Sequence, residues 1–524
     1  MKKIITLLLV LAAFVNITAQ DITGSWTGKL DIMGTKLNLV FNITKGSDGK
    51  IGCTLDSPDQ GAKGIPAEIT VTDGTAVKIT IQQLAVVYEG RLADGMLKGQ
   101  FTQNGFSFSL DMKPGTVKQD RPQTPQPPYP YTTEEVTFTN SDDNATLSGT
   151  MTYPTGFDKQ KKGTVPVVIM VTGSGQQNRD EELFGHKPFL VLADYLARNG
   201  IATLRYDDRG TGKSTGNAAQ ATTENNMKDA LAAVNYARKT GKFGSVGVLG
   251  HSEGGTIAFM LGSRGKADFI VSMAGPGVSG DSILIEQNRM ALAMTGLPPY
   301  MTDAYCTALA GVLASISDGT AMASPEEAVS KATEKAGNNL PQQLADNLAQ
   351  VIKTATPWLK YFIAYDPTDD IKAVKCPVMA INGEKDTQVS ALTNTAAIRR
   401  LLPGNPSNTI KTYPGLNHLF QTCTTGLAIE YGQIEETIAP EVLKDIAEWI
   451  NKVGKRDNNQ QHQRHARQSP PMTGTTIDKT LSPNRHANQK PVQKQKTAFR
   501  TPKDRLLQCK RPRLTTQYAT FYKL

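Results

Sequence analysis

One short stretch of this chain has the residue types and spacing for nucleophilic catalysis. In SVGVLGHSEGG (245–255), Ser252 lies between Gly250 and Gly254, after an apolar run and before a helical pattern. This G-x-S-x-G spacing is typical of a strained strand-to-helix turn that exposes a serine hydroxyl above a sheet. We expect Ser252 to be a nucleophile, with the positive end of the following helix directed at a developing oxyanion. The alternative is a glycine-rich turn without a catalytic role.

A serine hydroxyl is a weak nucleophile without a base beside it, and elimination selects His418 as that base. The chain has six histidines. His186 precedes Ser252, and we expect His251, inside the turn, to pack there rather than to ionise. His418 follows the last apparent strand, in TYPGLNHLF. The three others, in the C-terminal tail, are His462, His465 and His486.

The third member of such a triad is an acid that orients the histidine and stabilises its charged form. In the fold in which this strand–turn–helix motif occurs, the chain order is serine, acid, histidine. Asp386 follows an apolar strand in VMAINGEKDTQV, which leaves room for one helix and one strand before His418. Glu384 comes too early. We expect three further acids before the strand, namely Asp366, Asp369 and Asp370, to join a helical cap to the core instead.

The elements that must position these residues alternate between strands and helices. Short apolar runs and amphipathic stretches follow one another over 131–453, which predicts a mainly parallel sheet covered by helices on both faces. Residues 278–365 interrupt this pattern with helical, Met- and Ala-rich sequence, which predicts a helical cap insertion. The predicted buried strands are VPVVIMVTG (165–173), IATLRYD (201–207), SVGVLGHS (245–252), FIVSMAG (269–275) and CPVMAINGEKD (376–386).

The N-terminal part of the chain has a different pattern. Residues 20–113 contain short runs that alternate polar and apolar positions between turn signals, which predicts a small all-β domain, a barrel or a sandwich. Trp26 is interpreted as part of its core, although it could stack on a ligand. Residues 114–130 contain six prolines, so they are interpreted as an extended linker.

The run RYDDRGTGKSTG (205–216) resembles part of a phosphate-binding loop. That motif needs a glycine five positions before Gly212, and this chain has Asp207 there. A carboxylate at that position would occupy the space of a phosphate, so the spacing argues against nucleotide binding.

Together, GHSEGG, NGEKD and LNH make residues 131–453 resemble an α/β-hydrolase of the serine aminopeptidase-like and dienelactone hydrolase-like families. The resemblance implies that the run from Asp208 to Ser214 is structural. The backbone N–H groups of Glu253 and Ser174 are the candidates for the oxyanion hole, with Gly175 next. The charged residues 179–182 could bind a charged substrate group or form a solvated loop.

Both ends of the chain carry signals of their own. Lys2 and Lys3 precede an apolar run and Ala19, which predicts a signal peptide over 1–19 and a secreted or periplasmic protein; an uncleaved anchor is the alternative. The net charge of +9 comes from the tail, 454–524, with sixteen basic and three acidic residues. We expect this tail to be disordered, although a basic arm for acidic polymers is an alternative. The five scattered cysteines do not predict a zinc site.

These features favour a secreted serine hydrolase that cleaves carboxylic esters through an acyl-enzyme. A serine peptidase with the same triad is the first alternative, and a catalytically idle binding module is the second. The expected partner is a small ester or short peptide. No cofactor, metal, nucleic acid or membrane span is expected, and the sequence leaves the oligomeric state open.

Overall fold

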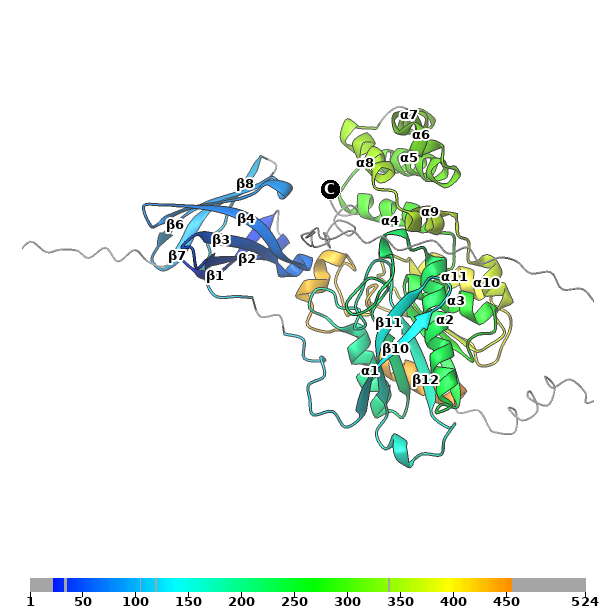
Figure 1. Ribbon diagram of the computed structural model, residues 1–524. Helices are drawn as coiled ribbons and strands as arrows, with labels where there is room; N and C mark the ends of the chain where they lie inside the picture. Colours follow the sequence, from blue (N-terminus) through cyan, green and yellow to red (C-terminus); the bar gives the residue numbers. More distant parts are fainter. Residues whose placement is uncertain (1–21, 33–34, 104, 118–119, 338–339, 455–524) are drawn as a thin grey trace, which may run out of the picture. The chain divides into compact units, whose positions relative to one another are not determined.

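The computed structural model describes residues 22–454 except 33–34, 104, 118–119 and 338–339 (Figure 1). The predicted signal peptide and almost all of the predicted tail lie outside the described residues, as does Cys509. The described cysteines Cys53, Cys306 and Cys423 are free.

The N-terminal part is one antiparallel sheet of nine strands among the described residues, in the order β8-β7-β6-β5-β4-β3-β2-β1-β9. The β1–β9 pairing and a Leu97–Met112 bridge bring its two ends together, so the sheet is barrel-like. Trp26 is buried in its core with Phe41 and Tyr88, as expected from the sequence. The strands are β1 (Gly24–Ile32), β2 (Thr35–Lys45), β3 (Ile51–Ser57), β4 (Ala62–Thr72), β5 (Ala76–Ile81), β6 (Val86–Ala93), β7 (Met96–Gln103), β8 (Phe106–Ser109) and β9 (Lys113–Pro114).

The second sheet has eight strands in the described part of the chain, in the order β10-β11-β13-β12-β14-β15-β16-β17. The strands from β12 to β17 run parallel, as predicted, while β10 and β11 are antiparallel additions at one edge. The strands are β10 (Thr132–Asn140), β11 (Ala145–Tyr153), β12 (Pro166–Val171), β13 (Ala202–Tyr206), β14 (Ser245–His251), β15 (Ile270–Met273), β16 (Val378–Gly383) and β17 (Thr409–Tyr413).

Helices cover both faces of this sheet, which confirms the predicted α/β class (Figure 1). Side chains from α2, α3, α10 and α11 join one buried cluster, and those from α1 and α12 join the other. Helix α2 begins at a Thr222 cap whose hydroxyl accepts from Asn225 N. These helices are α1 (Pro188–Arg198), α2 (Thr223–Thr240), α3 (Glu253–Ser263), α10 (Thr368–Ala373), α11 (Ala391–Leu401) and α12 (Pro440–Gly454).

The segment between β15 and α10, where the sequence predicts the cap, is helical. Its helices share a separate apolar core built around Leu309, Val312 and Leu348. They are α4 (Gly280–Met294), α5 (Pro299–Asp318), α6 (Thr320–Ala323), α7 (Pro325–Lys335), α8 (Gln342–Lys353) and α9 (Pro357–Ala364). No helix in the described residues is long and apolar enough to cross a membrane.

Candidate active site

Ser252 occupies a strained turn between β14 and α3. Its φ of 54° and ψ of −119° are unusual for a residue with a side chain. A Cβ at Gly250 would lie 1.8 Å from the Gly254 carbonyl oxygen, and one at Gly254 would lie 2.2 Å from that of Val171. The two glycines are therefore required because strand and helix backbones nearly touch here. This is the strand–turn–helix geometry expected from the G-x-S-x-G motif.

Asp386 and His418 lie side by side and are buried. His418 Nδ1 is 2.7 Å from Asp386 Oδ2. The other carboxylate oxygen, Oδ1, accepts from the backbone N–H groups of Gln388 and Val389, each at 2.8 Å. These bonds fix the carboxylate, and the carboxylate in turn fixes the ring.

The three predicted residues follow the carboxyl ends of three parallel strands of one sheet. Ser252 follows β14, Asp386 follows β16 and His418 follows β17. In a parallel sheet the carboxyl ends of all strands lie on the same side, where open α/β folds bind their ligands. Two rejected acids have other partners: Glu384 accepts from Gly415 N at 3.0 Å, and Asp370 binds the hydroxyls of Ser263 and Tyr365.

The two candidate oxyanion donors lie on elements next to Ser252. Glu253 is the first residue of α3. The loop after β12 passes so close that a Cβ at Gly173 would be 3.2 Å from Ser252 Cβ, and Ser174 follows it. The Ser174 side chain hydrogen-bonds to the Glu253 carboxyl group, which links the two candidates.

The Glu253 carboxyl group is buried beside the nucleophile. Burial raises its pKa, while hydrogen bonds, including those from Trp358 and Ser174, partly offset that effect. Trp358 Nε1 lies 3.0 and 2.9 Å from the two carboxyl oxygens and comes from the cap helix α9. Sequence patterns do not predict this contact, which connects the cap to the turn.

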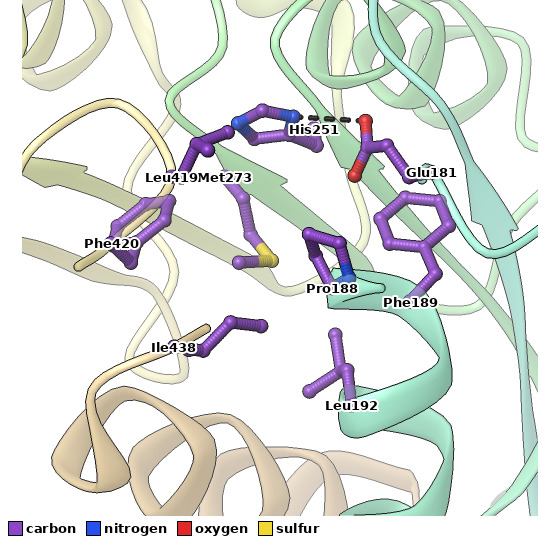
Figure 2. A pocket seen from close by; sticks show the side chains of 9 residues that line it. All are labelled: Glu181, Pro188, Phe189, Leu192, His251, Met273, Leu419, Phe420 and Ile438. Carbon is purple, nitrogen blue, oxygen red and sulfur yellow. Dashed lines mark hydrogen bonds and ion pairs between the residues drawn. The ribbon is translucent and has the colours of Figure 1, made fainter. Parts of the chain in front are cut away.

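A second buried carboxylate, Glu181, contacts the histidine inside the turn (Figure 2). Glu181 Oε1 is 2.9 Å from His251 Nδ1 and accepts from Gly173 N at 3.0 Å. His251 Nε2 is 3.0 Å from the backbone oxygen of His418. Figure 2 shows this pair above a small apolar pocket formed by Pro188, Phe189, Leu192, Met273, Leu419, Phe420 and Ile438.

One of the two predictions for the charged residues 179–182 was a solvated loop, and the structure does not support it. Arg179 forms ion pairs with Asp207 and Glu135, both at 2.8 Å, and its side chain is 14% exposed. Asp180 pairs with Arg205, and Glu181 is buried. Most of this charge is therefore used inside the domain, and only Glu182 is exposed.

In the run that resembles a phosphate-binding loop, the Asp207 carboxylate occupies the space that a phosphate would need. A Cβ at Gly212 would lie 2.5 Å from Asp207 Oδ2, and the same oxygen accepts from Lys213 N. Arg209 binds the buried Asp229 carboxylate at 2.7 Å. The run therefore ties loops of the domain together, as the resemblance implied. Among the described residues, no group of three or more His, Cys, Asp or Glu could hold a metal ion.

Residues 187–422 match the family model described as serine aminopeptidase, S33. Esterase EstD of Thermotoga maritima is 25% identical over 310 residues, which cover 58% of this chain and 66% of that protein, slightly under two thirds of its length. Similar solved structures include Pyrococcus furiosus esterase Pf2001 (16% identity, TM-score 0.34, 62% and 93% of the two chains). Another is Est1E of Butyrivibrio proteoclasticus with ferulic acid bound (16%, 0.34, 60% and 97%).

Proposed function

We propose that this chain, whose residues 187–422 match the family model described as serine aminopeptidase, S33, is a serine hydrolase that cleaves carboxylic esters. Ser252 is the nucleophile, His418 the general base and Asp386 its orienting acid. The observation that carries the proposal is the 2.7 Å contact between His418 and Asp386. It lies at the carboxyl ends of the parallel strands, where the strained turn also holds Ser252. The relative named Esterase EstD supports the choice of ester substrates.

The reaction follows from the roles of these groups. His418 Nε2 takes the proton of Ser252 Oγ as the oxygen attacks the ester carbonyl carbon. The N–H groups of Glu253 and Ser174 stabilise the oxyanion of the tetrahedral intermediate. His418 then gives its proton to the leaving alcohol as the ester C–O bond breaks. Water, activated by the same nitrogen, hydrolyses the acyl-enzyme and restores Ser252.

A serine peptidase with the same three residues is the second candidate, and the description of the matched family favours it. The two candidates differ in their leaving group, an alcohol or an amine. p-Nitrophenyl esters of increasing acyl length, assayed beside aminoacyl-naphthylamides, separate them. An enzyme that turns over the naphthylamides faster than every ester is a peptidase.

The assignment of the nucleophile has a direct chemical test. A fluorophosphonate should label the full-length protein once, with the adduct on Ser252 by peptide mass spectrometry. Ser252→Ala and His418→Ala should each remove nearly all turnover, and the double variant should be scarcely worse because the residues act as a unit. Losses that multiply in a folded double variant would contradict the triad.

The site of action is a further proposal, which rests on the basic and apolar composition of residues 1–19. A secreted or periplasmic enzyme should appear outside the cytoplasm in fractionated cells, shortened near Ala19. Full-length protein retained in the cytoplasm would contradict export.

A further inference from the structure

His251 has an acceptor oxygen at each of its ring nitrogens. Nδ1 lies 2.9 Å from the Glu181 carboxylate, and Nε2 lies 3.0 Å from the His418 backbone oxygen. A neutral imidazole has only one N–H, so it would leave one nitrogen lone pair facing an oxygen lone pair. The His251 side chain is only 8% exposed, which leaves little room for water to relieve that repulsion. The doubly protonated ring satisfies both contacts.

The surroundings of Glu181 match a charged partner. Its Oε1 accepts from both His251 Nδ1 and Gly173 N, so this oxygen has no room for a proton of its own. The Glu181 side chain is 3% exposed, and a carboxylate so buried needs a pairing charge. Glu181 also has a φ of 53°, a left-handed conformation that persists only where surrounding contacts enforce it.

We propose that His251 is held as an imidazolium by Glu181, and that it is a positioning residue that fixes the backbone of His418 and the loop of Gly173 around Ser252. Contacts of 2.9–3.0 Å run unbroken from Gly173 through Glu181 and His251 to His418. One end of this path is the candidate oxyanion loop, and the other is the backbone of the general base. His251 thereby sets the relative positions of two groups that must act on one substrate carbonyl.

The charges around the His251 ring set the pH range over which His251 can position the His418 backbone and the Gly173 loop. Burial lowers its pKa, but the Glu181 charge and hydrogen bond, the His418 backbone oxygen and the more distant Asp386 outweigh burial and raise it above the ordinary value. The His418 ring also faces it, with ring centroids 4.7 Å apart. Because the folded pKa is raised, the ordering contribution is complete at low pH and is lost as pH rises through that pKa. We therefore expect kcat to decline on the alkaline side.

The protonation state can be read without any activity. The full-length protein, labelled with ¹⁵N in its histidines only, should show both His251 nitrogens as N–H bearing at pH 6.5, with His251→Gln used to assign the signals. One protonated and one bare nitrogen at that pH would overturn the proposal. This arm separates the two claims: it stays informative even if esters are not substrates.

The kinetic arm rests on the proposed ester hydrolysis. Glu181→Gln keeps an oxygen for Gly173 N but removes the charge, so kcat should fall by between roughly 10- and 100-fold with little change in KM. The alkaline decline of kcat in this variant should occur at lower pH than in the parent. Glu182→Gln, at the exposed neighbouring position, is the matched control and should stay within about twofold of the parent. An unchanged kcat and alkaline limb in folded Glu181→Gln would overturn the positioning role, while the parent's turnover would leave the proposed function standing.

Discussion

Replacing Asp386 by Asn tests the proposed triad most sharply, because the structure predicts which way the new amide must face. The oxygen that accepts from Gln388 N and Val389 N can remain in place only as the amide oxygen. The amide NH₂ then occupies the position 2.7 Å from His418 Nδ1 and donates to it. His418 must carry its proton on Nε2, and the nitrogen that should take the Ser252 proton is blocked.

The size of this effect follows from the loss of the base. In serine proteases the same change lowers kcat by roughly 10⁴-fold, which corresponds to about 5.4 kcal/mol of transition-state stabilisation. The fold should persist because both backbone N–H groups keep their acceptor. The assay is kcat for p-nitrophenyl acetate, with thermal unfolding measured for each protein. A folded Asp386→Asn enzyme within tenfold of the parent would refute the assignment of Asp386.

Three further predictions concern the parts around the site. Trp358→Phe removes the donor to a buried carboxyl group, so it should cost about 1.5–3 kcal/mol of stability and raise KM; Trp449→Phe, which removes an indole bond to a backbone oxygen and ring packing against Phe269 outside the cap, should leave KM unchanged. A chain that ends at Gly454, the last residue of α12, should keep its melting temperature and esterase rate, and a fall of many degrees would show that the tail stabilises the fold. The fragment 120–454 should keep the parent kcat on a small ester, because it retains Arg121, which donates to three backbone oxygens of the hydrolase domain; an inactive but folded fragment would show that the β domain completes the site.

The sequence predicts the parallel part of the fold well because most of its strands are short, mainly apolar runs. Val378–Gly383 is buried at every position, and Pro166–Val171 is as well. A search for apolar runs does not find strand β10, because its last five residues alternate between buried and exposed positions. A strand with one covered face has the period-two pattern of an antiparallel edge, so it is recognised by alternation and not by apolar runs.

The candidate triad can be predicted from the sequence for a similar local reason. Ser252 is marked by the glycines that its turn requires, and Asp386 and His418 by the strands that precede them. Their supporting partners carry no such marker. Glu181 lies 70 residues before His251, inside a charged run that looks like ordinary surface loop. Trp358 lies 105 residues after Glu253 on a helix whose orientation the periodicity does not determine.

These partners bear on the choice between ester and peptide substrates. An aminopeptidase needs a carboxylate near the nucleophile that is free to bind the substrate's ammonium group. The two buried carboxyl groups next to the turn are already engaged: Glu181 by His251 and Gly173, Glu253 by Trp358. An ammonium group would have to displace the His251 imidazolium or the Trp358 indole to reach either, and it would have to lose its own hydration in doing so. An uncharged ester needs neither displacement, so the hydrogen-bonding of these two carboxyl groups favours esters over peptides with a free amino terminus.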